Sequence, residues 1–339
     1  MRALNLGLAA TAFLARSAAR VATCGLVGGT PAPSPVVAAG QPRGQQWTVL
    51  ADDGVVLHAE VDGDRRAPVT VVLCHGYALS GESWCFQRAE LARLARVVVW
   101  DQRGHGRSER GPAAHATIDQ LGRDLLAVLE QTSTTGPVVL VGHSMGGMAI
   151  MALAEQRPDL FGDVIAGVAL LGTSAGPVTA DLGLPSRGMD AMHRVAPWAL
   201  SALCRLSALS RIAPVRDLLR LLVPRHAFAS EVAPAVVDFL AGLIESVSPE
   251  VLVDFFPQFR YHDNRAALTA LQDVDCLVMA GEYDLITPCR DSEDIVNAMP
   301  HAEYVVVPGA GHAFPLEHPE LVNSQLIRFL GEFTRLLSA

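Results

Sequence analysis

The sequence predicts an α/β fold in which helices cover both faces of a mostly parallel sheet. From residue 47 onward, apolar runs rich in β-branched residues alternate with segments whose apolar residues recur at helical spacing. Several runs are apolar at every position, which is typical of strands buried on both faces. Because parallel strands need crossover connections, regular alternation of strand and helix favours a parallel sheet.

Composition indicates a globular protein that does not bind nucleic acid. Half of the 339 residues are hydrophobic, which is ample material for a large core. The formal net charge is −9, and no run of Lys and Arg could form a basic surface for phosphate backbones. The six cysteines show no CxxC spacing, and Cys74 and Cys276 lie in apolar runs. We therefore expect free thiols in the core.

Residues 1–46 differ in composition from the rest and are predicted to form an N-terminal extension that ends in a proline-rich linker. Residues 3–15 are apolar enough for a signal-peptide core, but only Arg2 precedes them, and Arg16 and Arg20 follow where a cleavage site belongs. This run is shorter than the roughly 20 residues that span a bilayer, so a retained segment would lie along a membrane surface. The sequence leaves three locations open: the cytoplasm, a membrane surface and, if the segment is removed, the exterior.

Eight segments are predicted strands. The first two, WTVLADD and VVLHAEV, flank Gly54 and predict an opening antiparallel pair. The others are the runs at 67–76, 97–101, 137–142, 164–172, 274–281 and 303–309. Helical spacing is clearest at 119–131, 145–157 and 288–298.

One stretch interrupts the alternation. Residues 177–262 contain helical patterns punctuated by prolines and no convincing strand, so we expect a helical cap inserted between two parts of the core, 47–176 and 263–339. The insertion leaves the sheet after one strand and returns before the next. It should therefore cover the carboxyl ends of the strands, where open α/β sheets bind ligands.

The motif GxSxG at 142–146 follows a buried run and opens a helical one. A serine at a sharp strand-to-helix turn is exposed by the strain of the turn, and small neighbours are needed because the backbone is crowded there. The alternative is an ordinary Gly-Ser turn before a helix. The strand before and the helix after favour Ser144 as a nucleophile.

A serine hydroxyl is a weak nucleophile near neutral pH, so it requires a base and an acid that orients the base. Asp284 follows the run at 274–281, and His312 lies in a glycine-rich loop after the last predicted strand, in the chain order serine, acid, histidine. The alternatives are a turn-forming aspartate and a surface histidine. Glu282 is the competing acid, but it leaves the strand too early.

Acyl transfer also requires N–H donors for the developing oxyanion. We expect the first from the backbone of Met145 and the second from Tyr77, in the loop after the run at 67–76. His75 is better explained as a residue that holds this loop by hydrogen bonding than as a catalytic base, and His143 as a residue that packs beside or supports the site.

Five motifs resemble the α/β-hydrolase superfamily in their order and spacing: HGY at 75–77, DQRGHGRS at 101–108, GHSMGG at 142–147, GEYDLITP at 281–288 and GAGHAFPLEHP at 309–319. The resemblance covers residues 47–336. It implies an eight-stranded sheet with Ser144 as nucleophile, His312 as base and Asp284 as orienting acid. A serine at the turn separates this chain from superfamily members that use aspartate there. Within the superfamily it resembles esterases, lipases and cofactor-free haloperoxidases.

The predicted function is that of a serine hydrolase that cleaves a carboxylic ester with a hydrophobic part through an acyl-enzyme. No metal or cofactor is required, and the expected partner is a small-molecule ester, with membrane contact only through the N-terminal segment. One alternative is acyl transfer, thioester cleavage or C–C bond hydrolysis on the same triad. Another is a non-catalytic ligand-binding protein that retains the fold.

Overall fold

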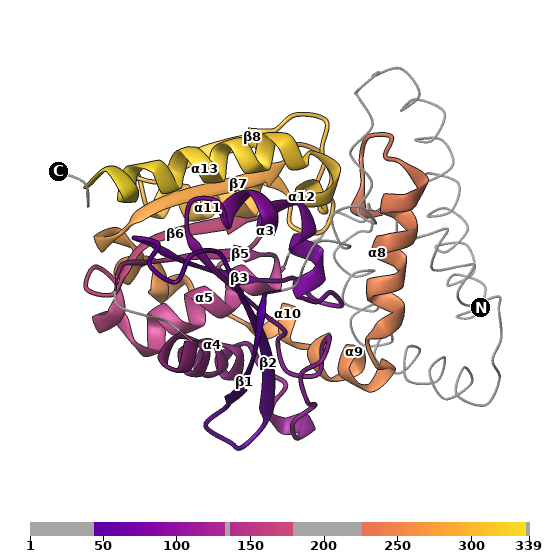
Figure 1. Cartoon of the computed structure of the whole chain (residues 1–339). Coiled ribbons are helices and arrows are strands. Elements are labelled where there is room, and N and C mark those ends of the chain that lie inside the picture. Colours follow the sequence, from indigo (N-terminus) through magenta and orange to yellow (C-terminus); the bar gives the residue numbers. More distant parts are fainter. Residues whose placement is uncertain (1–43, 133–135, 179–225, 337–339) are drawn as a thin grey trace, which may run out of the picture.

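The computed structural model describes residues 44–132, 136–178 and 226–336 (Figure 1). The predicted N-terminal extension up to residue 43 and residues 179–225 of the predicted cap lie outside this description. In the part of the chain that is described, no helix is both long enough and apolar enough to cross a membrane.

Eight strands form one sheet in the order β1-β2-β4-β3-β5-β6-β7-β8. Their bounds are β1 Gln45–Leu50, β2 Val56–Asp62, β3 Thr70–Cys74, β4 Arg96–Trp100, β5 Val138–His143, β6 Ile165–Leu171, β7 Asp275–Gly281 and β8 Glu303–Val307. β2 runs antiparallel to both β1 and β4, and all other neighbours are parallel. All eight predicted runs are therefore strands, and the predicted mostly parallel sheet is confirmed. β1 begins two residues before the predicted start at Trp47.

Helices cover both faces of the sheet because the central strands are apolar on both. In β3, Val71 and Leu73 face one apolar layer, whereas Val72 and Cys74 face the other. The helices of the first layer are α3 Cys85–Leu91 and α13 Pro319–Leu336, and those of the second are α4 Ile118–Thr132, α5 Met145–Gln156 and α11 Cys289–Ala298. The three predicted helices correspond to α4, α5 and α11.

Short helices complete the core: η1 Gly81–Trp84, η2 Ala113–His115, η3 Pro158–Leu160, η4 Arg265–Asp273 and α12 Phe314–Glu317. Cys74 and Cys276 are buried and unpaired, as predicted, and the thiols of Cys85 and Cys289 are also free. Cys24 and Cys204 lie outside the described residues.

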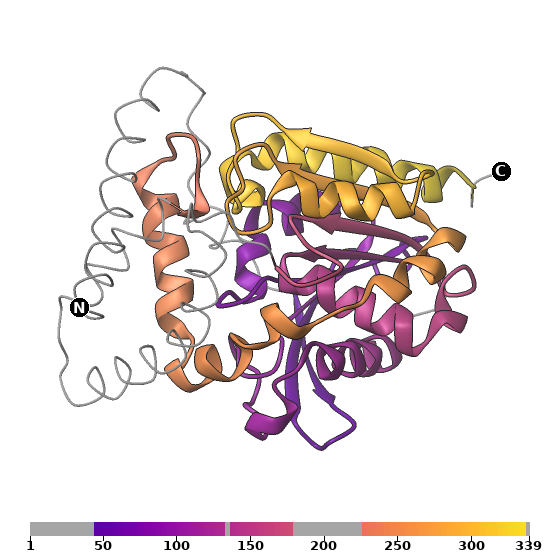
Figure 2. The same cartoon turned by 180° about the vertical axis from the view of Figure 1, so that it is seen from behind.

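The described residues of the stretch predicted to form the cap, which lies between β6 and β7, include α8 Pro234–Ser246, α9 Pro249–Phe255 and α10 Gln258–Tyr261. Figures 1 and 2 show α8 beside the core, at the opposite end from the C-terminus. Leu240 and Leu243 of α8 pack in one apolar cluster with Leu79, which follows β3, and Ala313, which follows β8. α8 therefore lies against loops that follow the carboxyl ends of the strands.

The connections into and out of this helical stretch lie side by side. Val178 N–H donates to the carbonyl of Phe259 at 2.8 Å, and Asn264 N–H donates to the carbonyl of Ala175 at 2.8 Å. These two bonds fix where α8, α9 and α10 join the core. The exact boundaries proposed for the cap, 177 and 262, stay a prediction.

Candidate active site

Ser144 occupies a strained turn between β5 and α5. Its φ of 53° and ψ of −119° lie outside the regions that L-residues normally adopt. A Cβ at Gly146 would lie 2.1 Å from the carbonyl oxygen of Cys74, and a Cβ at Gly142 would lie 2.6 Å from the backbone of Gly146. The two glycines of the GxSxG motif are therefore required by close backbone contacts, and the turn holds Ser144 in its unusual conformation.

Hydrogen bonds to the neighbouring strand end fix this turn. Ser144 N–H donates to the carbonyl of Leu171 at 2.9 Å, and the hydroxyl of Thr173 donates to the carbonyl of Ser144 at 2.8 Å. Both partners lie at or after the end of β6. A strained conformation persists only where its surroundings hold it, and these bonds supply that restraint.

The structure brings Asp284 and His312 together from the ends of β7 and β8. His312 Nδ1 lies 2.8 Å from Asp284 Oδ2, and both side chains are buried. The other carboxylate oxygen accepts the N–H groups of Ile286 and Thr287 at 2.8 and 3.0 Å. Burial opposes ionisation of Asp284, but the His312 ring and these donors outweigh it and hold the pKa of the carboxyl below its ordinary value.

Glu282 lies away from His312. Its Oε2 accepts the N–H of Gly309 at 2.8 Å in an exposed position. The carboxylate that reaches the imidazole is therefore that of Asp284, as the spacing along the chain predicts.

His312 is linked to the serine turn through His143, the residue before Ser144. His143 Nε2 donates to the carbonyl of His312 at 2.9 Å, and the centroids of the two rings are 4.9 Å apart. Within the described residues, no hydrogen bond joins the Ser144 hydroxyl to the His312 ring. Such contacts are often long in enzymes without substrate and tighten in the reacting complex.

The backbone around Ser144 also offers N–H donors. Met145 is the first residue of α5, and the first N–H groups of a helix have no acceptor inside the helix. The loop after β3 passes directly against the serine, because a Cβ at Gly76 would lie 3.3 Å from the Ser144 Cβ. Tyr77 follows in this loop. The two segments predicted to donate to an oxyanion are thus adjacent to Ser144.

His75 holds the loop after β3 by hydrogen bonding, as predicted, and His143 supports the site through its bond to the carbonyl of His312. His75 Nδ1 donates to the carbonyl of Gly76 at 2.8 Å, and its Nε2 accepts the N–H of Gln102 at 2.9 Å. Burial lowers the pKa of His75 to about 4. Burial, together with the nearby His312, lowers the pKa of His143 to about 3. Both rings are therefore neutral at physiological pH.

Sequence reasoning missed Thr287 and His105. The Thr287 hydroxyl lies 2.9 Å from Asp284 Oδ2 and 3.2 Å from His312 Nδ1, so it restrains both groups. The buried His105 ring accepts the N–H of Ala78 in the loop after β3 at 3.3 Å. The position of Thr287 three residues after the acid was a usable signal, but the fold alone brings His105 beside that loop.

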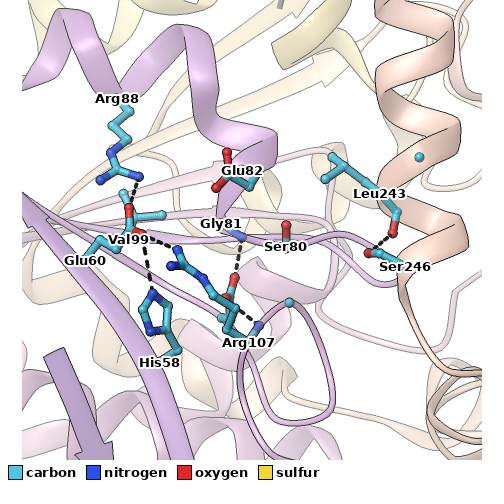
Figure 3. Close-up of a pocket in the computed structure, with 13 residues that line it drawn as sticks. His58, Glu60, Ser80, Gly81, Glu82, Arg88, Val99, Arg107, Leu243 and Ser246 are labelled. Atoms are coloured by element: carbon cyan, nitrogen blue, oxygen red, sulfur yellow. Dashed lines mark hydrogen bonds and ion pairs between the residues drawn. The ribbon is translucent and has the colours of Figure 1, made fainter. Parts of the chain in front are cut away.

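A polar cavity of about 290 Å³ lies between β2, η1 and α8, and its lining does not include Ser144 or His312 (Figure 3). The buried Glu60 carboxylate contacts the guanidinium groups of Arg88, at 2.5 Å, and Arg107. Asp101 accepts the backbone N–H groups of Gly81 and Arg107 at 2.8 and 2.9 Å. The Glu60 carboxylate is thus compensated by guanidinium groups within the protein. None of the residues that line the cavity belongs to the predicted triad, so we assign it no part in the reaction.

Comparison with known proteins identifies the family of the chain. Residues 71–325 match the sequence profile of the alpha/beta hydrolase family, which is most of the chain. The chain therefore belongs to the alpha/beta hydrolase family. Among the described residues, no group of three or more His, Cys, Asp and Glu side chains is arranged to hold a metal ion.

Similar proteins carry hydrolase and acyltransferase names. The chain is 28% identical to the sn-1-specific diacylglycerol lipase ABHD11 of Mus musculus, over 80% of this chain and 83% of that protein. It is 27% identical to the dihydrolipoyllysine-residue acetyltransferase component of the acetoin cleaving system of Pseudomonas putida, over 80% of this chain but only 65% of that protein. A thermophilic esterase from Thermogutta terrifontis has a similar structure, with a TM-score of 0.67, 26% identity and coverage of 86% of this chain and 99% of that one.

Proposed function

We propose that this protein is a serine hydrolase that cleaves a carboxylic ester, with Ser144 as nucleophile, His312 as base and Asp284 as orienting acid. The observation that carries the proposal is the buried 2.8 Å contact between Asp284 and His312, beside a serine in a strained strand-to-helix turn. A Gly-Ser turn that only connects a strand to a helix would not require a buried carboxylate–imidazole pair. Such pairs are typical of activated serine nucleophiles.

In the proposed reaction, Ser144 Oγ adds to the ester carbonyl carbon while His312 Nε2 accepts the hydroxyl proton. The N–H groups of Met145 and Tyr77 stabilise the negative oxygen of the tetrahedral intermediate. Collapse of the intermediate breaks the C–O ester bond, and His312 returns the proton to the departing alkoxide. A water molecule then adds to the acyl-enzyme while His312 accepts its proton. The second tetrahedral intermediate breaks the bond between the acyl carbon and Oγ, and His312 returns the proton to Ser144 as the acid product is released.

An apolar environment beside the oxyanion donors supports a substrate with a hydrophobic part. Met145 and Met148 of α5 pack in one buried cluster with Val251 and Phe255 of α9. The half-buried side chains of Tyr77, Leu252 and Phe259 lie at the margin of this cluster. We propose that this margin contacts the acyl or alcohol chain of the ester. The lipase and esterase names of similar proteins favour the same substrate class.

A panel of p-nitrophenyl esters from acetyl to dodecanoyl tests the proposal. The purified protein should hydrolyse them, with kcat/KM rising up to a few-fold per methylene, because burial of each CH₂ contributes about 0.8 kcal/mol, until the pocket is filled. Ser144→Ala should lose more than about 10³-fold in rate and should no longer react with a fluorophosphonate. Hydrolysis by the alanine variant at the native rate would exclude Ser144, and a flat chain-length profile would exclude the apolar subsite.

A further inference from the structure

The loop that follows β3 is attached to α9 and α10 through the side chain of Tyr77. The Tyr77 hydroxyl donates to the backbone carbonyl of Leu252 in α9 at 2.6 Å. The Tyr77 ring also meets the ring of Phe259 in α10 edge to face, with centroids 4.9 Å apart. One side chain thus joins the loop beside the nucleophile to a segment about half the chain away in sequence, through one polar and one aromatic contact.

Ala78, the next residue in this loop, is also held by contacts that lead to α9. Ala78 has a φ of 60°, a left-handed conformation that non-glycine residues rarely adopt. Its N–H donates to Nε2 of His105 at 3.3 Å, and the His105 ring packs against Phe255 of α9, with centroids 5.6 Å apart. Since a left-handed conformation needs support from its surroundings, α9 contributes, through His105, to the shape of the loop at Ala78.

Met145, the other proposed oxyanion donor, contacts the same segment. Met145 is fully buried in the cluster that contains Val251 and Phe255 of α9. Residues 248–261 therefore pack against both residues whose backbone N–H groups are assigned to the oxyanion hole. The path of this segment is fixed at its end by the hydrogen bond from Val178 N–H to the carbonyl of Phe259.

We propose that Tyr77 is a positioning residue that couples α9 and α10 to the oxyanion hole, so that the position of this segment sets the direction of the Tyr77 N–H. The inference rests on the proposed serine-hydrolase function. Oxyanion donors act by being fixed where charge develops, so a loop freed from α9 and α10 should stabilise the transition state less while binding neutral substrate equally well.

The test compares Tyr77→Phe, which removes only the hydroxyl, with Phe259→Leu, which removes the ring contact and leaves the hydroxyl. Tyr261→Phe is the matched control, because Tyr261 lies on α10 with 72% of its surface exposed. Each variant is assayed for kcat and KM on one hydrolysed ester and for melting temperature. Each is also assayed for affinity toward an alkyl trifluoromethyl ketone, which forms a negatively charged adduct with serine, and toward the matching secondary alcohol, which forms none.

Tyr77→Phe and Phe259→Leu should each lower kcat by about tenfold and lower trifluoromethyl ketone affinity about tenfold more than alcohol affinity, the effect of one hydrogen bond or a similar contact. Tyr77→Phe, which keeps the ring, should leave KM and alcohol affinity unchanged. Phe259 belongs to the margin proposed to contact the substrate, so any change in KM for Phe259→Leu should match its change in alcohol affinity. In the double variant, the fold-loss of kcat should be smaller than the product of the two single losses, because both substitutions break the same connection between the loop and α9–α10. Tyr261→Phe should behave as the native protein. Equal loss of affinity for ketone and alcohol, or native kcat in both single variants, would overturn the coupling. A native protein that neither hydrolyses esters nor forms the ketone adduct would instead overturn the proposed function.

Discussion

At the scale of single residues, the site depends on which carboxylate orients the imidazole. Asp284 and Glu282 are two residues apart, yet one is buried against His312 and the other is exposed at the N–H of Gly309. In an extended chain, side chains two residues apart point to the same side. The turn after β7 breaks this pattern, so Glu282 and Asp284 make different contacts. Asp284 N–H donates to the carbonyl of Gly281 at 3.1 Å, and this bond closes the turn.

Asp284→Asn should reduce kcat by about 10³- to 10⁴-fold with the fold intact, because an amide favours the wrong tautomer of His312. Glu282→Gln is the matched control and should change kcat less than twofold, since its carboxylate makes an exposed contact. Steady-state kinetics of both variants on the same ester, with circular dichroism to verify folding, measure the difference. A larger loss in Glu282→Gln would transfer the orienting role to that residue.

At the scale of elements, the turn from β5 into α5 is restricted by backbone contacts rather than by apolar packing. A Cβ at Gly146 would lie 2.1 Å from the carbonyl oxygen of Cys74, on the neighbouring strand β3. Backbone atoms cannot withdraw as the end of a flexible side chain can. Substitution here must displace either β3 or the turn that presents Ser144.

Gly146→Ala should therefore lower the free energy of unfolding by at least about 2 kcal/mol and reduce activity in parallel, as expected where a close backbone contact is broken. Gly242→Ala is the opposite case. Gly242 lies inside α8, and an added Cβ there would meet nothing within 4 Å. It should stabilise the protein by about 0.5–1 kcal/mol, because alanine loses less backbone entropy in a helix. Denaturant titration of both variants checks this contrast, and similar effects in the two would contradict it.

At the scale of the whole molecule, buried ion pairs join the antiparallel edge of the sheet to the helical layer. Glu60 of β2 contacts both Arg88 of α3 and Arg107 of the loop after β4. Burial raises the pKa of Glu60, but the two guanidinium groups outweigh burial and bring it below its ordinary value. A carboxyl with a lowered pKa in the folded state contributes stability above its unfolded pKa, and this contribution is lost as the pH falls through the folded value.

Glu60→Gln should cost about 1–3 kcal/mol of unfolding free energy at pH 7, because two guanidinium groups lose a charged hydrogen-bond acceptor, although Arg88 keeps its pair with Asp62 and Arg107 is 39% exposed. The gap to the native protein should narrow as the pH falls below the ordinary carboxyl pKa of about 4.3, and close as the pH passes through the lower pKa of Glu60 in the folded protein. Glu303→Gln is the control, since the Glu303–Arg328 pair is about 40% exposed and should contribute less than about 1 kcal/mol. Urea unfolding at pH 7 and pH 3.5 measures these differences. A gap for Glu60→Gln that does not change with pH would refute the ionic origin of its effect.

The sequence by itself determined the eight strands, the two-sided core and the identity of the serine turn, because these depend on local periodicity and on glycines that close contacts require. It also placed Asp284 and His312 after the correct strands, since chain order survives folding. Only the tertiary structure decided that β4 lies between β2 and β3, because residue patterns along a chain do not encode which buried strands pair. Only the tertiary structure also showed that Thr287 lies beside both Asp284 and His312, and that Tyr77 contacts α9 and α10. Those contacts join segments whose proximity arises only when the sheet, its loops and the inserted helices pack together.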